Sequence, residues 1–337
     1  MRVTGANSAN YTHEPDSSVR ERLRSGAVSK PFRFGAQVAD NKPGKAWADM
    51  ARMLEDGGYS TLYVPDHFDD QVAPMVAMTW AAAATSELRV GSLVFDNDFK
   101  HPVVLAKEAA TLDVLSDGRL DLGIGAGWMH TDYETSGIPF DSPGVRIDRL
   151  QEAVTIIKGL MAGAPFSFEG THYKIDNLIG TPRPVQQPHP PILIGAGAKR
   201  MLSYAAREAD IISVNFNLNA GFVGPDVVVT GTAELTAQKI NLIREVAGPR
   251  FDDIELSVTV FMAALHDDRE QLAEVVAGSF GQSPDLVLES PHFLAGTEQQ
   301  IIEQLQERRE RFGFSHVVFA GGSYEAMLPV VSKLAGT

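Results

Sequence analysis

From Pro31 to the C-terminus, the chain alternates between short apolar runs and stretches whose apolar residues recur at helical spacing. Eight runs have the length of strands, and each is followed by a helical stretch. This repeat is typical of a (β/α)8 barrel, whereas a doubly wound sheet rarely has so many strands without a reset half-way. We therefore predict the α/β class and a TIM barrel. The predicted strands span residues 31–38, 61–68, 89–95, 119–127, 191–197, 210–215, 254–265 and 316–322.

Three segments interrupt the alternation, near residues 163–190, 216–231 and 266–296. The first alternates like a hairpin and then becomes Pro-rich, the second is a loop of about fifteen residues, and the third is irregular and helical. The alternation resumes after each, so we predict insertions in a single catalytic domain (31–337) and expect them to shape the substrate pocket. Residues 1–30 are polar and have no apolar signal-peptide core, which predicts a flexible N-terminal arm.

Composition argues against several function classes. The 337 residues carry a net charge of -14, and such a surface repels nucleic acid and anionic membranes. The chain has no cysteine, which removes disulfides, thiolate metal ligands and cysteine nucleophiles, and it has no apolar run of membrane-spanning length. These features predict a cytoplasmic enzyme acting on a small molecule, with neither nucleic acid nor membrane as a partner.

The tetrapeptide IGAG occurs twice, at 124–127 and 194–197, each time at the end of an apolar run. Neither copy fits the G-x-G-x-x-G dinucleotide fingerprint, because Trp128, His130 or Arg200 stands where the third glycine is needed. At the C-terminal strand ends of a barrel, glycines let a flat ring or a phosphate approach the backbone. A plain tight turn is the alternative interpretation of either copy.

The second copy indicates an anion site. Gly195, Ala196 and Gly197 lead into a predicted helix, whose free N–H groups favour a negative charge. Lys199 and Arg200 follow in the first turn, where cations are slightly unfavourable for the helix dipole. We predict that these five residues bind a phosphate, with two solvated cations as the alternative.

The stretch VPDHF ends the second predicted strand and contains Asp66 and His67. His67 could serve as a general acid or base, or donate a hydrogen bond to a bound ring, and Asp66 could orient it or cap the loop. A structural histidine is the alternative. The acidic run 96–98 lacks metal-ligand spacing, so we predict no metal, and the absence of G-x-S-x-G and P-loop motifs gives hydrolase and kinase functions no support.

Together, YVPDHF, LSDGRLDLGIGAGW and PPILIGAGAKR resemble the luciferase-like monooxygenase superfamily, and within it the coenzyme F420-dependent oxidoreductases. The resemblance runs from about Phe32 to Ala320; it is most specific in LSDGRLDLGIGAGW and weak in the C-terminal third. It implies a TIM-like barrel with an insertion, often dimeric, that binds a flavin or deazaflavin at the C-terminal mouth of the barrel.

The resemblance also implies residue roles. His67, with Asp66 beside it, would lie near the reactive face of the ring, and Gln37 would contact ring or substrate. Leu93 and Val94 would form a non-prolyl cis peptide that backs the ring. Gly125 and Gly127 would make room for the ring and its chain, and the amides of residues 195–197 would bind the phosphate.

One departure bears on the substrate. Sugar-phosphate dehydrogenases of this group carry a glutamate where this chain has Trp128, which argues against glucose 6-phosphate. An aromatic residue there favours a more apolar substrate, stacked against Trp128 or Tyr133. F420 is the implied cofactor, with hydride transfer as its chemistry. Two alternatives stay open: an FMN-dependent monooxygenase served by a separate reductase, and a flavin-binding relative without catalysis.

Overall fold

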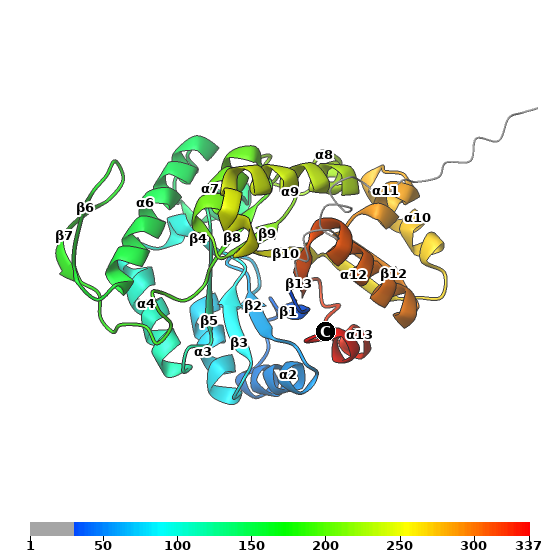
Figure 1. The fold of residues 1–337 in the computed structure, drawn as a ribbon, viewed down its shortest axis with the longest axis horizontal. Helices are drawn as coiled ribbons and strands as arrows, with labels where there is room; N and C mark the ends of the chain where they lie inside the picture. The colour runs from blue at the N-terminus through cyan, green and yellow to red at the C-terminus, as the bar shows by residue number, and fades with distance from the viewer. Residues whose placement is uncertain (1–29) are drawn as a thin grey trace, which may run out of the picture.

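The computed structural model describes residues 30–337, so the predicted N-terminal arm, apart from Lys30, lies outside the described residues. Its centre is a closed parallel barrel with eight strand positions (Figure 1). One position is shared by two strand segments, β3 and β4, which pair in turn with the same neighbour. The strands are β1 (Arg33–Gln37), β2 (Thr61–Val64), β3 (Arg89–Ser92), β4 (Phe95–Asp96), β5 (Leu120–Gly125), β8 (Ile192–Ala196), β9 (Ile211–Val214), β10 (Glu255–Val260) and β13 (Phe314–Phe319). The predicted fold is confirmed.

A helix follows each strand position and covers the outside of the barrel (Figure 1). Pro74, Pro102 and Pro143 open three of these helices, where a missing N–H costs nothing. A capping box between Thr297 and Gln300 begins another of these helices. The covering helices are α2 (Gly44–Asp56), α3 (Pro74–Ala84), α4 (Pro102–Leu115), α6 (Pro143–Met161), α7 (Lys199–Glu208), α9 (Ala233–Ala247), α12 (Glu298–Phe312) and α13 (Leu328–Leu334). Within residues 30–337, no helix has the length and apolarity needed to cross a bilayer.

The seventh predicted strand, 254–265, is wrong beyond Val260. The chain leaves the barrel at Phe261, whose N–H donates to the carbonyl of His292. It continues as β11 (Met262–Leu265), which pairs in parallel with β12 (Phe293–Gly296) in a separate small sheet. Sequence spacing missed β12 because its four residues lie in a segment that is otherwise helical, with α10 (Arg269–Phe280) and α11 (Pro284–Glu289). This segment has its own small apolar cluster, around Ala273, Val287 and Phe293.

The insertions lie in different places. The predicted hairpin is present as β6 (Pro165–Glu169) and β7 (Lys174–Ile179), and it projects away from the barrel at the left of Figure 1. It borders neither of the two large hollows at the barrel mouth, so the expectation that segment 163–190 shapes the pocket is wrong. Segments 216–231 and 266–296 do line those hollows.

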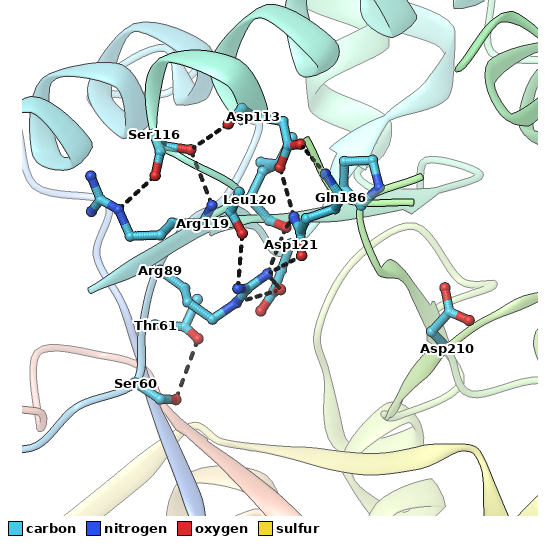
Figure 2. A network of polar contacts seen from close by, with 12 residues as sticks. Ser60, Thr61, Arg89, Asp113, Ser116, Arg119, Leu120, Asp121, Gln186 and Asp210 are labelled. Atoms are coloured by element: carbon cyan, nitrogen blue, oxygen red, sulfur yellow. Dashed lines mark hydrogen bonds and ion pairs between the residues drawn. The ribbon is translucent and has the colours of Figure 1, made fainter. Parts of the chain in front are cut away.

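The opposite end of the barrel is filled by a charged network (Figure 2). The Asp121 carboxylate accepts from Arg89 Nη2 at 2.6 Å and from Arg33 Nη2 at 3.0 Å. Burial alone would raise the pKa of Asp121, and the two guanidinium groups outweigh it, so its pKa lies below its usual value. Gln186 donates to Asp113 and to the carbonyl of Leu120, which fixes the Pro-rich segment to the same end. These contacts fix the geometry of this N-terminal end of the barrel, which we call the barrel floor.

Candidate active site

A cleft of about 960 Å³, including its open mouth, lies at the C-terminal ends of the barrel strands. This is the end at which TIM barrels bind their ligands. Most of the residues singled out from the sequence border it, although they come from five different strand ends. Those residues are Gln37, Asp66, His67, Leu93, Val94, Gly125, Gly127, Trp128, Gly195, Ala196 and Gly197.

His67 has a carboxylate partner, and the partner is Asp132. Asp132 lies in the short helix α5 (His130–Ser136), and its Oδ2 is 2.7 Å from His67 Nδ1. Its Oδ1 accepts from the N–H of Phe68 at 3.1 Å, which fixes the carboxylate against the loop. Because Nδ1 is held in this way, Nε2 is the ring nitrogen left for a bound molecule. The Trp128 ring packs edge-on against the imidazole of His67, with 5.6 Å between the centres of the two rings.

Asp66 does not orient His67 and instead joins a second acidic group, which corrects the sequence interpretation. Asp66 Oδ2 accepts from the N–H of Asp96 at 3.2 Å. Burial raises the pKa of Asp66 to about 6 and that of Asp96 to about 7. Asp96 also caps the following turn by accepting from the N–H of Asp98 at 2.9 Å. Two weakly acidic carboxyls thus line the same wall of the cleft.

Tyr133 is not available to a substrate, and the prediction that it stacks on one is corrected. Its side chain is buried, and its hydroxyl donates to the Asp96 carboxylate at 2.7 Å. Tyr133 and Asp132 are adjacent in α5 and both point inward, so this helix supports the cleft from behind. Trp128, the other predicted substrate residue, does border the cleft.

The Leu93–Val94 peptide bond is cis, as the resemblance implied. The Gln37 side-chain amide donates to the carbonyl of Leu93 at 2.8 Å, so Gln37 holds this bulge. The Val94 side chain lies against both glycine-rich strand ends. A Cβ at Gly125 would approach Val94 Cγ2 to 2.7 Å, whereas one at Gly195 would be 3.7 Å from Val94 Cγ1. Gly125 therefore makes room for the bulge, whereas a methyl group at Gly195 would make only an ordinary van der Waals contact with Val94.

The last glycine of each copy is required by packing inside the chain. Gly127 has φ +71°, and a Cβ there would collide with Tyr133 and Asp96. A Cβ at Gly197 would lie 1.7 Å from the carbonyl oxygen of Phe216. At these two positions, contacts within the chain require glycine, so the geometry there does not call for the predicted approach of a ring or phosphate.

Lys199 and Arg200 do not line the cleft, which corrects the prediction that they hold a phosphate. They lie in the exposed first turn of α7, and Arg200 pairs with Asp148 of α6 and with the carbonyl of Gly144. The helical turn directs Ala198 and Met201 to the cleft instead. Ala198, the N-cap residue, offers no side-chain bond, so the N–H groups of the first turn are left for a bound anion.

Arg146 borders the cleft and was missed by the sequence interpretation. It is buried in the first turn of α6, where its Nε donates to the carbonyl of Ala126 at 3.1 Å. Its guanidinium lies 4.0 Å from the centre of the Phe140 ring. A single arginine in an amphipathic helix carries no sequence signal that would have found it.

Comparison with known proteins decides the family. The model of the luciferase-like monooxygenases matches residues 25–285. The chain belongs to this family.

Relatives of this luciferase-like chain include an F420-dependent glucose-6-phosphate dehydrogenase from Kineococcus radiotolerans, 34% identical over 54% of this chain and 56% of that protein. The 5,10-methylenetetrahydromethanopterin reductase of Methanopyrus kandleri is 28% identical over 81% of this chain and 78% of that protein. The structure of the coenzyme F420-dependent tetrahydromethanopterin reductase from that organism covers 90% of this chain and 98% of its own, with a TM-score of 0.72 and 20% identity. The relatives are oxidoreductases, which supports an enzyme here.

A buried hydroxyl in the cleft of this luciferase-like barrel is free to bind a ligand. The hydroxyl of Ser213 borders the cleft, is buried, and has no hydrogen-bond partner among residues 30–337. A buried hydroxyl without a partner is destabilising unless a ligand supplies one. Ser213 pairs in register with Gly195, which also borders the cleft. The Ser213 hydroxyl and Gly195 therefore lie on neighbouring strands at the same depth.

Proposed function

We propose that this chain is an F420-dependent oxidoreductase that transfers a hydride between the deazaflavin and an organic small molecule. The observation that carries the proposal is His67, held by Asp132 at the rim of a cleft with glycine-rich strand ends. Relatives named as F420-dependent support the choice of cofactor.

In this proposal the Leu93–Val94 bulge would hold the ring, and the amides of residues 195–198, at the start of α7, would hold the phosphate. Ser213 supplies a hydrogen bond that the chain itself leaves unfilled. Bound deazaflavin supplies hydride transfer, and the protein contributes binding, orientation and electrostatics.

His67 acts on the substrate proton. Asp132 accepts a hydrogen bond from the Nδ1–H of His67 and fixes the ring orientation, so Nε2 takes a proton from a substrate hydroxyl or returns one to a substrate carbonyl. Asp132 is a positioning residue, since it acts through His67. Trp128 packs on the imidazole and reduces the access of water.

Two further expectations belong to this proposal. A homodimer and a cytoplasmic location remain predictions from the family resemblance and the composition. A substrate such as glucose 6-phosphate is not proposed, because Trp128 stands where the sugar-phosphate enzymes carry a glutamate.

Titration of the purified chain with F420 and with FMN, followed by absorbance and fluorescence, tests the cofactor. We expect stoichiometric F420 binding and weak FMN binding. Stoichiometric FMN binding with no F420 binding would contradict the proposal, and oxygen consumption with reduced FMN and substrate would then assign a monooxygenase with a reductase partner.

A further inference from the structure

A second hollow opens beside the cleft, with about 1530 Å³ of space including its mouth. The two hollows share His67, Trp128 and Leu93 as a common wall. A molecule in the second hollow therefore reaches the same imidazole as a molecule in the cleft.

The outer wall of this hollow is formed by two segments that interrupt the regular alternation of strands and helices. Loop 216–231 lies on one side, and β11, α10 and α11 lie on the other. The apolar side chains that these segments add to the lining include Val223, Val229, Met262, Val276, Phe280 and Leu286. Such side chains are stabilised only when something apolar covers them.

The lining offers no counter-charge for an anion. No lysine or arginine lines the hollow among residues 30–337, and Asp69 is its carboxylate. His292 also borders it, and its Nδ1 is 2.8 Å from the carbonyl of Thr259, so this nitrogen carries the proton. Its Nε2 is buried and has no partner within the same residues. A phosphate or carboxylate would lose its hydration here without gaining a cation in return.

The insertion that carries this wall packs as a unit of its own. Ala273, Ala277 and Val287 form part of a small cluster separate from the barrel core. Val276 packs against that cluster and also lines the hollow, whereas its neighbour Val275 is 63% exposed and does not line it. Two adjacent valines of α10 thus differ in whether they face the hollow.

Resting on the proposed function, we propose that the second hollow is the substrate chamber and that it takes an uncharged, predominantly hydrocarbon molecule carrying a hydroxyl or carbonyl group. The oxygen function lies at the His67 end, and the hydrocarbon part lies against the apolar side chains of α10, α11 and loop 216–231. The shared wall carries this assignment, together with the absence of a lysine or arginine from the lining among residues 30–337.

Calorimetric titration of the full chain, before any cofactor is added, tests the chamber independently of the redox chemistry. The probes are 2-decanol, decanoate and decyl phosphate, which share a similar hydrocarbon length and differ in charge. We expect 2-decanol to bind at least roughly tenfold more tightly than either anion, because the anions lose hydration. Equal or tighter binding of an anion, or no binding of 2-decanol, overturns the chamber, while the F420 titration separately tests the proposed function.

A matched pair of variants locates the binding. Val276→Lys places a cation in the wall and should weaken 2-decanol binding roughly tenfold while improving decanoate binding. Val275→Lys should leave both affinities unchanged. Leu286→Lys, at a lining position that is 39% exposed, gives a second test if Val276→Lys fails to fold.

Two results would overturn the assignment. The first is an equal loss of 2-decanol binding in Val275→Lys and Val276→Lys, which would indicate a different binding surface. The second is a concentration-dependent dimer that Val276→Lys dissociates in sedimentation, together with no 2-decanol binding, which would indicate that a second copy of the chain covers the hollow.

Discussion

Asp121 at one end of the barrel differs from Asp66 and Asp96 at the other end in having arginine partners. At the N-terminal end, Asp121 lies between Arg33 and Arg89, and its pKa is lowered. At the C-terminal end, Asp66 and Asp96 form no ion pair within residues 30–337, and burial raises the pKa of each.

This difference in pairing predicts that the N-terminal end serves stability and that the C-terminal end serves ligand binding or catalysis. Paired charges at the barrel floor stabilise one geometry, because removal of Asp121 would take from Arg89 the carboxylate with which it pairs. Unpaired carboxyls with raised pKa values are destabilising at neutral pH, and they occur at the end where TIM barrels bind ligands. We therefore expect substitutions at the floor to change stability and substitutions at the mouth to change binding or turnover.

The largest effect should come from the mouth. His67→Ala should lower kcat by about 10²- to 10⁴-fold, the range typical of a lost general acid or base. Asp132→Asn keeps the shape of the side chain and removes its charge, so it should lower kcat less. Cofactor affinity, measured by fluorescence titration, should change little in both variants, and unchanged turnover in His67→Ala would remove this residue from the mechanism.

At the floor, Asp121→Asn should lower the free energy of unfolding by about 3 kcal/mol, since Arg89 loses the carboxylate it pairs with and Arg33 keeps only Glu255. Urea denaturation measures this loss, and cofactor affinity of the remaining folded protein should match that of the wild type. Asp148→Asn, which breaks an exposed pair with Arg200, is the control and should cost less than about 1 kcal/mol. Equal losses in the two variants would contradict a special role for the floor network.

A smaller, pH-dependent effect should distinguish the mouth carboxyls from the floor. The pKa of Asp96 is raised from 3.8 to about 7, so between these values the folded chain holds a proton that the unfolded chain has lost. The unfolding free energy should therefore fall as pH rises through this window. Asp96→Asn should be more stable than the wild type by about 2 kcal/mol at pH 8 and should lose this advantage near pH 4.

The control for that measurement is Asp176→Asn in the exposed β7 strand, which should show the same stability difference at both pH values. An Asp96→Asn variant that is less stable than the wild type at pH 8 would show that the hydrogen bonds of Asp96 outweigh its desolvation.

The sequence predicts the parts of the mouth that lie in contiguous motifs, and it does not predict contacts between distant residues. His67, the bulge at Leu93–Val94 and the strand-end glycines lie in contiguous motifs at strand ends, so the barrel topology alone brings them to one mouth. Asp132 is 65 positions from His67, and its inward direction depends on how α5 packs. No local pattern encodes that contact.

The sequence predictions that the structure corrects failed for the same reason, because contacts between distant residues decide those parts of the structure. β11 and β12 are four-residue strands that exist only because they pair with each other across the 266–292 segment. The charged floor joins residues of β1, β3 and β5, and each one alone reads as an ordinary polar residue at a strand start. The nearness of Lys199 and Arg200 to a glycine motif predicts a phosphate site, whereas Arg200 pairs with Asp148 of α6.

The smallest expected effect concerns Arg200, in the first turn of the helix that begins at the proposed phosphate site. Arg200→Ala should change F420 affinity by less than about twofold, because the guanidinium is exposed, screened by solvent and paired with Asp148. Arg52→Ala, an exposed arginine of α2 paired with Asp49, is the matched control, and both variants are measured by fluorescence titration at two salt concentrations. A tenfold loss confined to Arg200→Ala and relieved by salt would mean that this side chain leaves Asp148 to meet the phosphate. The backbone amides at the start of α7 would then be insufficient to hold the anion without a cation from the same helix.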